Sequence, residues 1–248
     1  MAQTYKTEGI ILKRWDYKEQ DRMVRILTRD FGKITTRAIS ARKITAKLAG
    51  SLEPFIHADF FIARSKTIDI VAGSNIIFGN VKLRHSLLPM ACANFFGEIV
   101  DRLTPERQAD KELFLYVNRV LQWLNENDPH LLAFYAAIVQ LFGLVGHSLE
   151  LYQCHACKKP TTEQGSKLNY QLWNIECCYC HSREDTLSLS GATIKALRFL
   201  LQQDFPQAAK LHLPQTTWEE LYQALHKIMC YHFEKPLLSE NLFLQALN

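Results

Sequence analysis

The sequence lacks a long apolar run and a recognisable leader segment. Its longest apolar stretch covers residues 131–146, is interrupted by Gln140, and falls short of the roughly 18–20 residues that a membrane-spanning helix needs. The N-terminal MAQTYKTEGIILKRWD has neither an uninterrupted apolar segment nor a small-residue cleavage site, so we expect no signal peptide. These absences predict a protein of a reducing cytoplasm with no membrane partner, where stable disulfides are rare.

The motifs of common catalytic sites are also absent. The sequence contains no glycine-rich phosphate loop, no G-x-S-x-G, no H-E-x-x-H and no H-x-E…P-C-x-x-C pattern of zinc deaminases. Its nine histidines are scattered, and none stands beside a candidate nucleophile. Glu98 and Asp101 have helical spacing that is typical of a solvated helix surface. We therefore expect a binding protein with no catalytic residues, not an enzyme.

Positive charge is present, and it is concentrated in the first third of the chain. The 248 residues carry a formal net charge of +4. Residues 1–80 contain 14 Lys and Arg against 8 Asp and Glu, whereas residues 81–150 contain 6 against 8 and the remainder is balanced. A positive charge excess of this size often means only that the basic side chains lie on a solvent-exposed surface. In an otherwise neutral chain, a basic N-terminal module also suits a polyanionic partner.

The spacing of apolar residues predicts an α+β chain with several domains. Within residues 1–80, five short segments rich in β-branched and aromatic residues predict a small closed barrel of the OB type, one of several small-barrel folds that fit this pattern. From about residue 85 the period becomes helical. We predict an OB-type barrel at 1–80, an α-helical domain at 81–150 and 191–248, and a cysteine-rich module at 151–190 inserted into the helical domain.

Two of these segments have a clearly two-sided pattern. In KITTRA, alternation places Lys33, Thr35 and Arg37 on one side and Ile34, Thr36 and Ala38 on the other. In ADKELFLYVNRVLQWLNEN, helical spacing forms one apolar face from Leu113, Val117, Val120, Leu121 and Leu124. The first pattern predicts a barrel strand with a basic outer side, and the second predicts a helix that packs on a core.

Five of the seven cysteines lie in one segment, residues 154–181. Cys154 and Cys157 form one C-x2-C pair, Cys177 and Cys180 form another, and nineteen residues separate the pairs, a spacing typical of a four-cysteine zinc site. Each C-x2-C turn directs two thiolates at one tetrahedral ion, and a closed shell of four leaves no position for water. The sequence therefore predicts one structural Zn²⁺.

The cysteines could instead form disulfides, but these are rare in a reducing cytoplasm. They could also be buried free thiols, but the polar residues around them make burial less favourable. If Cys178 were the ligand in place of Cys177, only one residue would separate it from Cys180, and the two thiolates would be less well placed for one tetrahedral ion. His155 and His181 are alternative ligands. No role is evident for Cys178.

A set of motifs spans nearly the whole chain in order. These are the G-I-I-L strand, an acidic turn with Glu19 and Asp21, the T-R-x-x-G-K hairpin, the basic A-x-x-A-R-K segment, LEPF at 52–55, and GEIVDRLTPERQADKELF. An apolar helix leading into C-x-x-C and the closing YHFEKPLLSENLFLQAL follow. In this combination the chain resembles the bacterial RecO family of DNA-repair mediators. IECCYC departs from the pattern, because that family more often has glycines before the second knuckle.

The resemblance implies a non-enzymatic protein with an OB barrel, a helical domain and, in some members, a zinc module. Members of that family bind single- and double-stranded DNA, anneal complementary strands, and work with RecR to load the RecA recombinase onto DNA coated by single-stranded DNA-binding protein. The helical part receives the acidic C-terminal tail of the coating protein, so Arg119, Lys195 and Arg198 are candidates for a basic rim.

Basic residues of the barrel are the candidates for contacts with DNA phosphates, which carry no sequence information. The predicted contacts are Lys33, Arg37, Arg42, Lys43 and Lys47, with Lys13, Arg14, Arg22 and Arg25 as secondary candidates. Trp15, Tyr17 and Phe31 are candidates for base stacking, although packing in the core or a turn is the simpler explanation of each.

Two other functions stay open at this point. A zinc-ribbon regulator that binds nucleic acid would share the cysteines and the basic barrel, but it would prefer one sequence. A metal-dependent nucleic-acid enzyme would need an open coordination position, which a shell of four cysteines does not leave.

Overall fold

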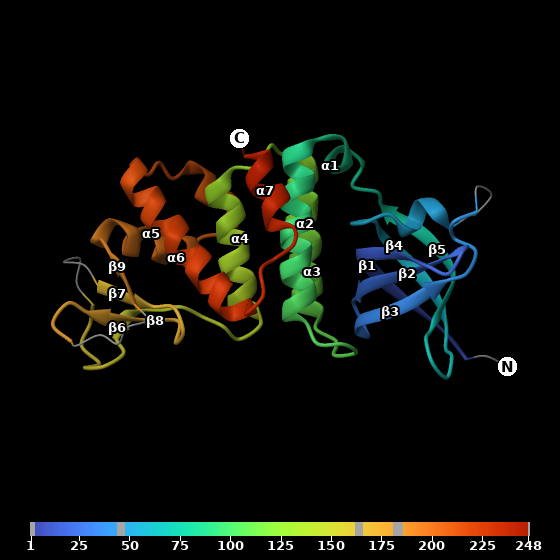
Figure 1. Ribbon diagram of the computed structural model, residues 1–248, viewed down its shortest axis with the longest axis horizontal. Coiled ribbons are helices and arrows are strands. Elements are labelled where there is room, and N and C mark those ends of the chain that lie inside the picture. Colours follow the sequence, from blue (N-terminus) through green and yellow to red (C-terminus); the bar gives the residue numbers. More distant parts are fainter. Residues whose placement is uncertain (1–2, 44–47, 162–165, 181–185, 248) are drawn as a thin grey trace. The chain divides into compact units, whose positions relative to one another are not determined.

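The computed structural model describes residues 3–43, 48–161, 166–180 and 186–247. Contacts divide the chain into two compact units (Figure 1). Unit 1 is Met1–Pro129 with Leu238–Asn248, and unit 2 is His130–Leu237. The domain boundaries predicted at residues 80, 150 and 190 mark changes in secondary-structure type, whereas these two units are defined by residue contacts. The predicted boundaries therefore stay a prediction.

Unit 1 begins with a closed barrel of five strands. The strands are β1 (Thr4–Tyr17), β2 (Asp21–Thr28), β3 (Gly32–Ala38), β4 (His57–Ala63) and β5 (Ile70–Phe78). They are hydrogen-bonded in the order β1-β2-β3-β5-β4, and β4 pairs with β1 to close the barrel. Buried side chains such as Ile26 and Phe60 fill the interior. The predicted OB-type barrel is confirmed.

Strand β3 has the predicted alternation, and its start requires glycine. Ile34, Thr36 and Ala38 are buried, while Thr35 and Arg37 are partly exposed. Gly32 has φ +67°, and a Cβ there would lie 2.1 Å from the Gln108 carbonyl oxygen. Only glycine accommodates both the left-handed backbone and this close approach. Next to it, the Arg107 N–H donates to the Lys33 carbonyl at 2.8 Å, so the segment after α2 is attached to the barrel.

The described part of unit 1 also contains a short 3-10 helix (Ala49–Leu52) and four α-helices: α1 (Val81–His85), α2 (Leu87–Leu103), α3 (Lys111–Glu126) and α7 (Glu240–Ala246). Asp110 caps α3, since its carboxylate accepts a hydrogen bond from the Leu113 N–H at 2.9 Å. The apolar face predicted for this helix, from Leu113 to Leu124, is buried. Helix α2 contacts α1, α3 and α7 and lies among them in Figure 1.

Helix α7 is attached to α2 by a ring contact and a carboxylate. The rings of Phe95 and Phe243 stack with centroids 5.0 Å apart. The Glu98 carboxylate accepts hydrogen bonds from the Ser239 hydroxyl (2.6 Å), the Ser239 N–H (2.8 Å) and the Leu238 N–H (3.1 Å). Burial raises the pKa of Glu98, but these bonds and the Arg102 guanidinium outweigh it and hold the pKa below its usual range. The solvated surface predicted at Glu98 is therefore wrong.

We expect Glu98→Gln to lower the free energy of unfolding of unit 1 by about 1–2 kcal/mol near pH 7, because hydrogen bonds to a charged acceptor are lost. Urea unfolding of wild type and variant measures this difference. Since the Glu98 pKa is lowered in the folded state, its contribution is present above the usual carboxyl pKa and disappears as the pH falls through the folded value. Glu126→Gln, at an exposed position, is the control. A pH-independent difference would contradict this account.

Unit 2 combines helices with a small four-stranded sheet. Its main elements are α4 (Leu131–Leu144), β6 (Glu150–Cys154), β7 (Ser166–Asn169), β8 (Asn174–Cys177), β9 (Thr186–Leu189), α5 (Gly191–Gln202) and α6 (Gln215–Phe233). The sheet order is β6-β8-β7-β9. Helix α4 is almost entirely buried. Its Gln140 amide donates to the carbonyls of Leu200 and Gln203, both at 2.7 Å, which satisfies acceptors at the end of α5.

Candidate nucleic-acid interface and metal centre

The structure brings together the four cysteines of the two C-x2-C pairs. Their sulfur atoms all lie within 4.8 Å of one another. The Sγ–Sγ distances are 3.8 Å for Cys154–Cys180, 3.8 Å for Cys157–Cys177 and 3.5 Å for Cys177–Cys180. A tetrahedral ion with Zn–S bonds of about 2.3 Å separates its sulfurs by about 3.8 Å. The arrangement therefore fits one zinc ion.

The electrostatics of the four thiols are also compatible with a bound cation. Burial raises the pKa of Cys154, but the N–H groups of Cys157, Cys177 and Ala156 outweigh it and lower the pKa to about 6. Hydrogen bonding with the Cys177 and Cys157 thiols raises the pKa of Cys180 to about 12. Thiols this close do not all ionise alone, because each negative charge opposes the next. A soft divalent ion stabilises all four thiolates, and Zn²⁺ is typical of four sulfur ligands.

Backbone hydrogen bonds shape the first of the two turns. The Lys158 N–H donates to the Cys154 carbonyl, and the Cys154 N–H donates to the Lys159 carbonyl, both at 2.9 Å. Cys178 is exposed and stands outside the group of four. His155 is also exposed and outside it, and His181 lies outside the described residues.

Most of the predicted barrel cations form ion pairs. The pairs are Arg14–Glu53 (2.5 Å), Arg22–Asp16 (3.5 Å), Arg25–Asp101 (2.8 Å), Arg37–Asp21, and Arg42–Asp16 (3.4 Å). Lys33 is the most enclosed, since its side chain is 8% exposed and its Nζ lies 3.1 Å from Asp101 Oδ1. It also donates to the Asp101 carbonyl. Here the structure differs from the predicted phosphate contact, because Asp101 of α2 binds the Lys33 ammonium.

Lys13, Arg42 and Lys43 are more accessible than Lys33. Lys13 and Lys43 are exposed, and neither forms an ion pair with any residue that the structure describes. Arg42 is 38% exposed at its side chain. Lys47 lies outside the described residues.

An aromatic ring and several cations meet at the β1–β2 turn. Tyr17 is 36% exposed, and the Lys18 Nζ and the Arg37 guanidinium each lie 5.6 Å from its ring centroid. The Arg42 guanidinium donates to the Lys18 carbonyl at 3.2 Å, so the loop after β3 lies against this turn. We call Tyr17, Lys18, Arg37, Arg42 and Lys43 the hairpin surface. It offers a ring for stacking and positive charges for phosphates.

The Asp21 carboxylate connects two parts of the hairpin surface through hydrogen bonds. This buried carboxylate accepts hydrogen bonds from the Ser40 N–H at 2.8 Å and from the Arg37 Nε–H at 2.8 Å. The Ser40 N–H and the Arg37 guanidinium hold the Asp21 pKa below its usual range, so the carboxylate stays ionised. Asp21 thereby fixes both Arg37 and the loop that carries Lys43.

Sequence reasoning missed Lys18 and the organising role of Asp21. The turn DYKEQD contained both, but its acidic residues concealed the basic character of the turn. The other aromatic candidates are packed: the Arg25 guanidinium lies 5.7 Å from the ring centroid of Trp15, and Phe31 contacts Tyr5 with centroids 4.5 Å apart. Tyr17 is therefore the best placed of the three for stacking.

Comparison with known proteins covers both parts of the chain. Residues 1–79 match the family described as Recombination protein O N terminal, and residues 84–241 match Recombination protein O C terminal. The chain belongs to the RecO family. Membership assigns it to DNA repair and recombination.

Individual RecO relatives align over most of their length. A DNA repair protein RecO of Dehalococcoides mccartyi strain BAV1 is 30% identical over 93% of this chain and 91% of its own. The DNA repair protein RecO of Roseiflexus sp. strain RS-1 is 30% identical over 93% and 82%. That of Bacillus subtilis strain 168 is 27% identical over 89% and 86%. None of the helices described in this RecO-family chain has the length and apolarity to cross a membrane.

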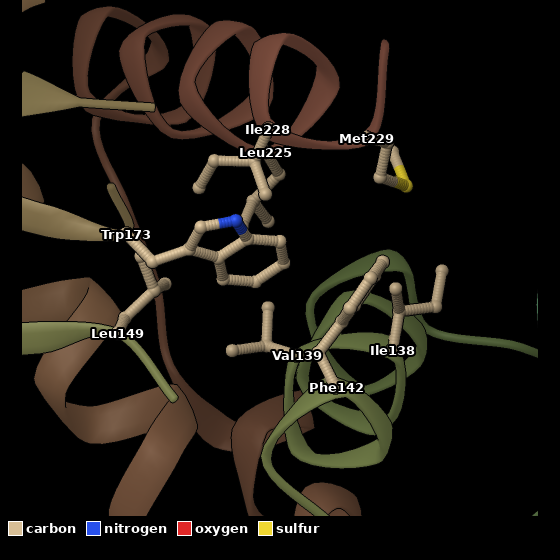
Figure 2. Close-up of a pocket in the computed structure, with 8 residues that line it drawn as sticks. All are labelled: Ile138, Val139, Phe142, Leu149, Trp173, Leu225, Ile228 and Met229. Carbon is tan, nitrogen blue, oxygen red and sulfur yellow. The ribbon is translucent and has the colours of Figure 1, made fainter. Parts of the chain in front are cut away.

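Unit 2 of this RecO-family chain contains a narrow apolar slot (Figure 2). Its lining residues are Ile138, Val139, Phe142, Leu149, Trp173, Leu225, Ile228 and Met229. The slot has a volume of about 10 Å³, which is close to the space that one water molecule needs. A partner's side chain does not fit such a space, so the slot is part of the packing between α4 and α6.

Proposed function

We propose that this chain is a non-enzymatic mediator of DNA repair and recombination. In this proposal it binds single- and double-stranded DNA without sequence preference and anneals complementary strands. With RecR it helps to load RecA onto single strands coated by single-stranded DNA-binding protein, in the bacterial cytoplasm at the nucleoid. The observation that supports DNA binding most directly is the hairpin surface, where cations surround the exposed Tyr17 ring.

The chemistry of the hairpin surface suits binding without sequence preference. Lysine and arginine neutralise phosphates, which are the same at every nucleotide. The Tyr17 ring can stack on any base of an unpaired strand, because every base has a π face. Charge neutralisation also favours annealing, since two strands that repel each other in solution are held on one positive surface.

A single structural Zn²⁺ belongs to the proposal. Cys154, Cys157, Cys177 and Cys180 would hold it, and the bound ion would connect β6 to the end of β8. Four sulfur ligands close the coordination shell, so this ion would activate no water. Its contribution would be to the folding of unit 2.

The acidic C-terminal tail of single-stranded DNA-binding protein is a proposed partner of the helices. Of the three predicted rim cations, Arg198 is used inside unit 2, where its guanidinium donates to the Leu151 carbonyl (2.6 Å) and the Thr161 hydroxyl (2.9 Å). Arg119 on α3 and Lys195 on α5 are exposed, and they are the candidates that remain.

We expect Lys18→Gln with Lys43→Gln to weaken binding to all DNA sequences alike. Two lost phosphate contacts should reduce the slope of log K against log salt by about 1.4–1.8. Fluorescence anisotropy with labelled oligonucleotides between low and high salt measures the slope. Lys227→Gln, an exposed lysine of unit 2, is the matched control. An unchanged slope in the double variant would remove the hairpin surface from the DNA contact.

Annealing of complementary strands coated with single-stranded DNA-binding protein tests the function itself. We expect this protein to accelerate annealing and the double variant to do so less. A strong preference for one sequence in a binding panel would instead support a zinc-ribbon regulator.

A further inference from the structure

Unit 2 has an open cleft beside the apolar slot. The cleft has a volume of about 370 Å³ and is lined by His147, Gln171, Trp173, Tyr231, His232 and Glu234. These residues come from the segment after α4, the β7–β8 turn, and the end of α6 with the residue that follows it. The volume lies at the small end of the usual range of sites for small ligands.

Aromatic rings form the walls of this cleft. The His232 ring stands edge-on to His147 (centroids 4.6 Å apart) and to Trp173 (5.6 Å). Trp173 lines both the cleft and the apolar slot, and Figure 2 shows its indole among the aliphatic side chains of α4 and α6. Packing in the slot thus holds one part of the indole, while another part borders the cleft.

The backbone is held in an unusual conformation at two of the lining residues. Trp173 has φ +56° and Glu234 has φ +53°, both in the left-handed region that non-glycine residues rarely occupy. Such conformations persist only where the surrounding structure imposes them, and they concentrate at binding sites. The fold thus presents the Trp173 ring and the Glu234 carboxylate at one cleft.

The charge of the cleft favours a cation. Glu234 is exposed and forms no ion pair with any part of the chain that the structure describes. Burial, together with the neighbouring His147, lowers the pKa of His232, so this imidazole is neutral at neutral pH. Aromatic faces attract cations, and a carboxylate adds a hydrogen-bond acceptor that fits a guanidinium. The same carboxylate repels phosphate.

We propose that this cleft binds an arginine side chain of a partner protein. The planar guanidinium would stack against the aromatic walls while its N–H groups donate to the Glu234 carboxylate. Arginine suits this site better than lysine, because it stacks on rings and binds carboxylates in a fork geometry. This contact is separate from the hairpin surface and from the tail of single-stranded DNA-binding protein, which is acidic.

The indole N–H signal of Trp173 in a ¹H–¹⁵N spectrum reports on the cleft directly. The chain has four tryptophans, and Trp173→Phe identifies the signal by its loss. The probe is acetyl-Gly-Arg-Gly-amide at up to about 10 mM, the range suited to a contact worth only a few kcal/mol. We expect a saturable shift of the Trp173 signal, and no shift with the citrulline peptide, which is nearly the same shape but neutral.

Two variants complete the experiment. Glu234→Gln keeps the shape of the side chain, and we expect it to weaken peptide binding about fivefold or more. Glu219→Gln, an exposed position of α6 outside the cleft, should leave binding unchanged. Equal shifts with arginine and citrulline, or no shift at 10 mM, would overturn the proposal. A shift with an oligonucleotide but not with the peptide would also overturn it and identify a site for nucleobases.

Discussion

Cys154→Ser combined with Cys180→Ser is expected to unfold the four-stranded sheet of unit 2 and to leave the barrel folded. The strands of this sheet have four or five residues each, which is too few for a stable sheet with a core of its own. Small zinc modules gain about 10–16 kcal/mol from the metal. We therefore expect a loss of at least about 5 kcal/mol in unit 2, because part of its core is formed by helices.

Metal content by mass spectrometry and thermal unfolding by circular dichroism measure the effect. Wild-type protein should contain one zinc per chain, and a chelator should reproduce the unfolding caused by the double variant. Cys178→Ser is the matched control, since Cys178 is exposed and outside the group of four. It should change neither metal content nor melting temperature. If DNA binding fell in the double variant while its melting temperature held, the cysteines would act at the DNA and not in folding.

The parts of this protein that sequence predicts well depend on local spacing. The two C-x2-C pairs predict the group of four cysteines because each turn places its own two thiols, and only the meeting of the turns depends on the fold. The alternation in β3 and the helical period of α3 are equally local, and both agree with the structure. The order of such segments was enough to predict the OB-type barrel.

The surface chemistry of the barrel depends instead on distant partners. Lys33 was predicted to contact phosphate, but Asp101, 68 residues away, takes up its charge. Asp101 itself was predicted to be solvated, and it accepts two cations. A count of charges along the chain does not show which lysines and arginines are already paired. For that reason the positive charge of the first third of the chain indicated a polyanionic partner, but it did not indicate which residues contact that partner.

The same pairing makes Asp101 important for stability. We expect Asp101→Asn to lower the free energy of unfolding of unit 1 by about 3 kcal/mol, because removal of one partner leaves a buried charge uncompensated. The Asp101 side chain is 14% exposed and that of Lys33 is 8% exposed, so water replaces little of the lost interaction. Arg25 also loses its partner, but it is 28% exposed and can be partly solvated. Urea unfolding followed by circular dichroism measures the change, with the transition of unit 2 as an internal reference.

A second substitution separates lost charge compensation from lost packing. If the cost of Asp101→Asn comes from the buried Lys33 ammonium, then adding Lys33→Met, which keeps an unbranched side chain without the charge, should recover more than half of the lost stability. Glu106→Gln is the control on the same side of β3, since Glu106 is exposed and its carboxylate only accepts a hydrogen bond from the Thr35 hydroxyl at 3.0 Å. A double variant no more stable than Asp101→Asn alone would show that Asp101 acts through packing. DNA binding gives an independent measure: because the Lys33 side chain is only 8% exposed, the double variant should bind DNA with the salt dependence of the wild type.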